Sequence, residues 1–165
     1  MIKPIDPDTT VTLVSPFDPA IDEDASNIEN YKQDFLKDPE AWRKHLVMKE
    51  GAQPTEFIFG VIPTSILNRI EGESGYGQPL ANMSMLSWGA FLHGLRDIKN
   101  GPTVETTDRA GKPTYVVPKV RVNDVEYVDP TWLSRTFVKH LREGAIHIGY
   151  LGWKWQQLDP GDVKK

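Results

Sequence analysis

The chain has 165 residues, of which 39% are hydrophobic and 25% charged, and it contains no cysteine. This length suits one domain with a sizeable buried core, and the lack of cysteine excludes disulfides, thiolate metal sites and a cysteine nucleophile. The net charge is −4, and residues 1–40 alone hold ten acids and three bases. The rest of the chain therefore carries a net charge of +3, which is too dilute for a basic patch of the kind that binds nucleic acid.

Residues 1–25 predict an extended, acidic, proline-rich arm. Only residues 11–14 form an apolar run, which could pair as one short strand. The segment has too little apolar surface to fold alone, so we expect either a flexible terminus or a segment that orders against a partner. We therefore divide the chain into an arm, residues 1–25, and an α+β domain, residues 26–165.

The next two predicted elements are a polar helix and a hairpin. Ile28, Tyr31 and Phe35 place one apolar stripe along a helix over residues 26–37. Two β-rich runs, at residues 43–48 and 55–63, flank a Gly/Pro turn. This pattern predicts an antiparallel hairpin.

Two helices are predicted to follow. Thr64 or Ser65 can cap a short helix that ends in the glycine-rich stretch 72–78. Apolar residues then recur at three- and four-residue steps over residues 79–100, until Asn100-Gly101-Pro102. We expect a single long helix there.

The second half begins with a polar, turn-rich segment at residues 101–114. Two β-rich runs around Asn123-Asp124 predict a second hairpin. Asp129-Pro130 predicts a helix start, with an N-cap followed by proline at the first helical position. The glycines beyond residue 143 weaken helicity, so the end of the chain is expected to be a kinked helix or a break followed by a helix.

No catalytic, cofactor or metal motif is found. His140 and His147 lie seven residues apart, which is too far for a metal pair without further ligands. The glycine-rich loop lacks the Lys-Ser/Thr pair of a phosphate-binding loop. The sequence therefore predicts a protein that is not an enzyme and has no cofactor. An enzyme would need a pocket assembled from scattered residues such as His93, His140, Glu71 and Glu73.

Large aromatic residues gather near the carboxyl end, and such rings dominate protein interfaces as well as protein cores. We expect Trp132 in the core. The residues predicted to contact a partner come from the arm and from this aromatic segment: Val11, Leu13, Phe17, Tyr150, Trp153 and Trp155. An alternative is stacking of Trp153 and Trp155 on single-stranded nucleic acid. It would use three cations as well, Arg135, Lys139 and Arg142.

Two stretches carry a family resemblance. Residues 42–63, with Gly51-x-x-Pro54-Thr55-x-Phe57 before an apolar strand, resemble the opening of small tail-assembly chaperones and accessory proteins of tailed bacteriophages. Residues 141–149 and 153–158 are similar to the carboxyl-terminal helical region of those proteins. The resemblance covers about a third of the chain and implies a phage-encoded, non-enzymatic assembly or virion protein.

Together these observations predict a compact single α+β domain of two hairpins and three to four helices with an extended amino-terminal arm. We expect it to bind other phage structural proteins or copies of itself, with no membrane role. The start of the chain lacks a basic segment followed by an apolar run, so the expected location is the host cytoplasm during assembly and then the virion. The alternative in the same class is a cytoplasmic tail-assembly chaperone that is absent from the finished particle.

Overall fold

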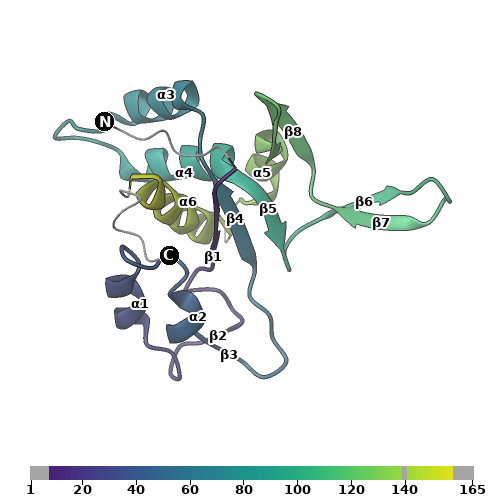
Figure 1. Ribbon diagram of the computed structural model, residues 1–165, viewed down its shortest axis with the longest axis horizontal. Helices are drawn as coiled ribbons and strands as arrows, with labels where there is room; N and C mark the ends of the chain where they lie inside the picture. Colours follow the sequence, from purple (N-terminus) through teal and green to yellow (C-terminus); the bar gives the residue numbers. More distant parts are fainter. Residues whose placement is uncertain (1–7, 139–140, 158–165) are drawn as a thin grey trace.

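Runs of helices and runs of strands follow one another along residues 8–138 and 141–157, which the computed structural model describes (Figure 1). This mixture of helices and small antiparallel sheets confirms the predicted α+β class. Within those residues no helix is both long and apolar enough to cross a membrane. In chain order the elements are β1 (Thr10–Leu13), β2 (Ile21–Asp22), α1 (Ile28–Asp34), α2 (Trp42–His45), β3 (Val47–Met48), β4 (Glu56–Gly60), α3 (Thr64–Ser74), α4 (Met83–Gly94), β5 (Leu95–Lys99), β6 (Val104–Thr107), β7 (Pro113–Val116), β8 (Lys119–Val122), β9 (Val125–Val128), α5 (Pro130–Thr136) and α6 (Arg142–Gln157).

The centre of the fold is an antiparallel sheet with strand order β1-β4-β5. Val11 of β1 lies opposite Phe59 of β4, and Leu13 lies opposite Phe57. Because side chains alternate along a strand, these four residues share one face of the sheet. All four are buried, and they form part of the main hydrophobic core.

Helices α4 and α6 pack tightly on one another, and α6 also contacts β1 and β4. Glycines make this close packing possible. A Cβ at Gly149 would overlap the carbonyl oxygen of Ser87 in α4, and a Cβ at Gly152 would lie 2.5 Å from a ring carbon of Phe59. Gly149 and Gly152 are therefore contact points within one continuous helix, α6. The predicted break followed by a helix lies before these glycines, because α5 ends at Thr136 and α6 begins at Arg142.

The expected amino-terminal arm is built into this body from residue 10 onward. β1 is an edge strand of the central sheet, as the apolar run predicted, and β2 pairs with β3. Residues 1–7 lie outside the described part of the chain. The segment from residue 10 onward is part of the body rather than a free arm because its apolar side chains are buried in the chain's own core. These side chains are Val11, Leu13, Val14 and Ile21.

The first predicted hairpin is wrong. Residues 42–45 form the short helix α2, β3 pairs with β2, and β4 pairs with β1 and β5. The two β-rich runs therefore do not pair with each other. Contacts between segments distant in sequence decide the partners of both strands, which a local turn pattern does not reveal.

The predicted long helix over residues 79–100 is also wrong at both ends. It begins at Met83, where the Asn82 side chain accepts a hydrogen bond from the Met85 amide, and it ends at Gly94. Residues 95–99 form β5, whose register against β4 shifts between Ile58 and Phe59. A bulge of this kind turns both Leu95 and Ile98 inward. Leu95 and Ile98 lie three residues apart, which is close to the period of a helix, and the sequence pattern therefore predicted a helix there.

The shorter elements follow local chemistry more closely. Asn123 and Asp124 have φ of 52° and 63° and form the turn between β8 and β9, and Asp129 caps α5 through the Thr131 amide, as predicted. In contrast, α3 begins after Pro63 with no side-chain cap, so neither Thr64 nor Ser65 is its N-cap. Residues 101–114, expected to be turn-rich, contribute most of a hairpin of β6 and β7.

Candidate functional site

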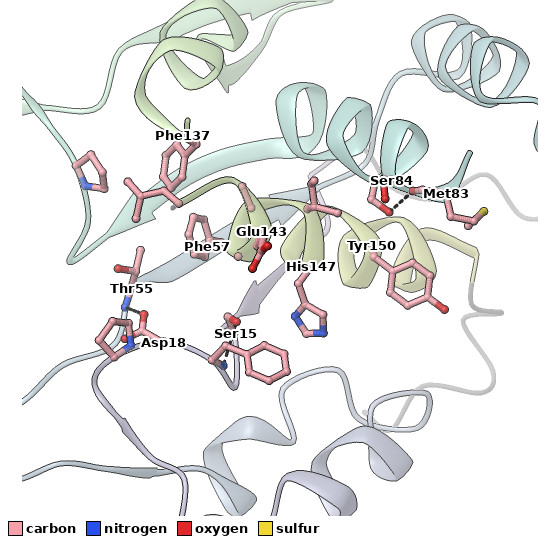
Figure 2. A pocket seen from close by; sticks show the side chains of 18 residues that line it. Ser15, Asp18, Thr55, Phe57, Met83, Ser84, Phe137, Glu143, His147 and Tyr150 are labelled. Atoms are coloured by element: carbon pink, nitrogen blue, oxygen red, sulfur yellow. Dashed lines mark hydrogen bonds between the residues drawn. The ribbon is translucent and has the colours of Figure 1, made fainter. Parts of the chain in front are cut away.

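A groove of about 780 Å³ opens in the described part of the chain. Its walls come from the first half of α6, the start of α4, the loop between β1 and β2, and β4 (Figure 2). This volume equals that of roughly 25 water molecules at about 30 Å³ each, so several side chains of a ligand fit inside.

The groove is lined mainly by large apolar side chains. Phe57 and Phe137 are buried in the core and contact each other, with ring centroids 6.0 Å apart. Phe17, Met83 and Leu141 are 59%, 37% and 51% exposed. Large apolar side chains left in water around a groove are typical of a surface that binds a partner.

His147 lies within the groove, facing the loop after β1 (Figure 2). The edge of its ring meets Phe17, with centroids 5.5 Å apart, and its buried Nδ1 has no hydrogen-bond partner among the described residues. Burial lowers the pKa of His147, and the positive charge of Lys32 lowers it further. The imidazole is therefore held in its neutral form at neutral pH.

Most of the other polar groups of the groove are occupied in holding the fold. The Asp18 carboxylate accepts hydrogen bonds from the amides of Ala20, at 2.8 Å, and Thr55, at 3.0 Å. The Ser15 hydroxyl accepts one from the Phe17 amide, and the Ser87 hydroxyl donates one to the Met83 carbonyl. These bonds fix the shape of the walls.

Among the described residues, the lining of the groove contains two carboxylates, Asp18 and Glu143, and neither lysine nor arginine. Glu143 is exposed and stands in the first turn of α6. No group of three or more His, Asp or Glu in the described ranges could hold a metal ion. The groove can thus offer apolar contact and negative charge to a ligand.

The structure brings two of the predicted contact residues, Phe17 and Tyr150, into this groove. Val11 and Leu13 are 4% and 0% exposed and contact the chain's own core instead of being presented to a partner. Trp155 is half-buried, with its ring edge-on to Phe59.

Trp153 is also buried, at 4% exposure. Its ring meets Tyr76 edge-on at 5.0 Å, and its Nε1 donates to Glu71 Oε1 at 3.3 Å. A ring enclosed in this way cannot stack on a nucleic-acid base, so the stacking alternative loses its first residue. Of the cations in that alternative, Arg142 lies over the Trp88 ring, at 4.9 Å from its centroid, and Lys139 is outside the described residues.

The residues of the enzyme alternative have structural partners of their own. Glu71 contacts Trp153, and His93 lies 3.5 Å from an Arg69 guanidinium nitrogen. Burial and the Arg69 charge lower the pKa of His93. His140, the other histidine of this alternative, lies outside the described residues.

Sequence reasoning missed Met83, Phe137, Leu141 and His147 as groove residues. By spacing alone, Met83 falls in the apolar pattern of the helix predicted over residues 79–100, and Phe137 and Leu141 follow the helix start at Asp129-Pro130. Apolar residues at such positions count as core. The available signal was that apolar residues surround α4 on more than one side, including the exposed Met83 and Met85.

The chain was compared with known protein families, curated proteins and solved structures. No known protein family, curated protein or solved structure matches the chain.

Proposed function

We propose that the chain is a non-enzymatic structural or assembly protein of a tailed bacteriophage, which binds a segment of another protein in the groove between α4, α6 and the β1–β2 loop. The groove is the observation that carries the protein-binding part. The phage setting rests on the resemblance of residues 42–63 and 141–158 to tail-assembly and accessory proteins.

The energetics of the groove support a protein partner. Phe17, Met83 and Leu141 each leave a large part of an apolar side chain in water. Burying such a side chain fully contributes roughly 1.5–3 kcal/mol. All three line the same groove, and a few well-packed side chains dominate the binding energy at protein interfaces.

A photo-crosslinking amino acid in place of Phe17, introduced in cells that produce the phage, tests this proposal. The matched control carries the same amino acid in place of Leu80, which is 96% exposed and outside the groove. We expect position 17 to form a covalent adduct with a defined polypeptide and position 80 to form none. Identical adduct patterns at the two positions would contradict a protein-binding groove.

The same experiment separates the two forms of the proposal. If the adduct is recovered from purified particles, the chain is a component of the virion. An adduct found only in the soluble fraction of the host indicates a tail-assembly chaperone that leaves before the particle is complete.

A further inference from the structure

The hairpin of β6 and β7 stands away from the body of the protein (Figure 1). All four β6 residues are exposed, as are Tyr115, at 68%, and Val116, at 44%. Neither strand packs extensively on another element of the described chain. Because a lone two-stranded hairpin is marginally stable in water, an external contact would stabilise this one.

The hairpin combines a few exposed apolar side chains on strands of mixed composition with a basic tip. Val104 pairs with Val116 near its base, and Tyr115 stands on the opposite face. At the tip, the Asp108 carboxylate accepts hydrogen bonds from the amides of Ala110 and Lys112, both at 2.9 Å. This carboxylate is occupied by the turn, whereas the side chains of Arg109 and Lys112 are exposed.

The groove has the complementary properties. It offers exposed Phe17, Met83 and Leu141 to apolar side chains. Among the described residues that line it, the charged side chains are two carboxylates: Asp18, which accepts two backbone amides, and Glu143, which is exposed. Opposite charges arranged in this way steer a partner and fix its orientation.

We propose that the β6–β7 hairpin of one copy of this chain inserts into the groove of a second copy, with the cations of its tip meeting Glu143. This inference rests on the proposed function, because it requires that the groove binds a polypeptide. It identifies that polypeptide as the hairpin of a second copy. The hairpin points away from the body, so the occupant comes from a neighbouring copy. Such a contact joins two different surfaces. It therefore produces a ring or a filament, or a closed dimer where two copies exchange hairpins reciprocally.

A charge exchange tests the contact between the tip and the groove. We expect Arg109→Glu and Glu143→Lys each to weaken self-association about tenfold, as measured by sedimentation velocity over a hundredfold range of concentration. The double variant should recover most of the affinity, because the pair is restored with its signs exchanged. The controls are Arg121→Glu and Glu73→Lys, which are exposed residues outside both surfaces.

Mixing two variants tests the head-to-tail geometry. The first replaces residues 103–116 by a short Gly/Ser linker and keeps the groove. The second, Phe17→Asp with Glu143→Lys, keeps the hairpin. Each should be a monomer alone, the second at about 18.7 kDa and the first below that because residues are removed. The mixture should contain a 1:1 complex and nothing larger, because only one donor and one acceptor remain.

Several outcomes would overturn the inference. They are a wild-type chain that stays monomeric over the whole range, a hairpin deletion that leaves the oligomer unchanged, and single charge variants that the double variant does not rescue. Thermal melts of every variant identify any that fail to fold, and for those Tyr115→Ser in the hairpin replaces the charge variant, with Leu80→Ser as its control.

The crosslinker at position 17 separates this inference from the proposed function. An adduct between isotopically distinct copies that maps to residues 104–116 supports both. An adduct with a different polypeptide alone would overturn the self-association and leave the proposed function standing.

Discussion

Replacing Gly149 by alanine probes the closest approach in the fold, between α4 and α6. The added Cβ would overlap the carbonyl oxygen of Ser87, lie 2.8 Å from its carbonyl carbon, and lie 3.0 Å from the Cβ of Phe91. Carbon atoms in ordinary contact are about 3.5–4.0 Å apart. The obstacle is helix backbone, which cannot rotate aside as a side chain can, so the two helices must separate by roughly 1 Å.

The magnitude follows from two opposing effects. Overpacking of a dense core costs about 1–3 kcal/mol, occasionally more, whereas alanine is favoured over glycine in a helix by up to about 1 kcal/mol. Because the Ser87 carbonyl belongs to the α4 backbone, we place the overpacking cost at the upper end of its range. The net loss in the free energy of unfolding is then about 2 kcal/mol.

The control is Gly144→Ala in the same helix, where an added Cβ meets nothing within 4 Å. This variant should gain up to about 1 kcal/mol from helix propensity. The two alanine variants should therefore differ by about 3 kcal/mol. Urea denaturation would show the difference as a shift of about 1–3 M in the midpoint. If the free energies of unfolding of the two variants differed by less than about 0.5 kcal/mol, the close packing of α4 on α6 would be refuted.

Two further predictions concern the core and the histidines. Phe59→Ala should destabilise the protein by about 3–5 kcal/mol in urea titrations, because its fully buried ring fills the space between Gly94 and Gly152; a loss below 1 kcal/mol would contradict this. Burial lowers the folded-state pKa of His93 and of His147, so the unfolded chain binds more protons than the folded one. The free energy of unfolding is therefore highest above the unfolded pKa of about 6.5 and falls as the pH drops below that value. Urea midpoints at pH 5.5 and 7.5 should differ for the wild type and much less for His93→Gln/His147→Gln, whereas an equal difference in both would refute the assignment.

The site was only partly predictable from the sequence. Phe17 was predicted as a contact residue and lines the groove, because it follows the buried Pro16 in a loop and points outward. Trp153 was predicted for the same role and is buried, because Tyr76 and Glu71 cover it. Nothing in the local sequence separates these two rings, since each is a large apolar residue next to a charged one, Asp18 or Lys154. Only the residues that lie across from them decide their exposure.

The sequence by itself determined the elements that depend on neighbouring residues. Asp129 and Pro130 start α5, and Asn123-Asp124 closes the β8–β9 hairpin, because capping and turn formation involve only a few adjacent residues. Tertiary structure alone decided that residues 95–99 pair with β4 as a strand, that β3 and β4 have different partners, and that the α6 glycines lie against Ser87 and Phe59. The groove belongs to this second group. Its walls come from segments that are far apart in the chain, and their apolar side chains meet only after the sheet and the α4–α6 pair have formed.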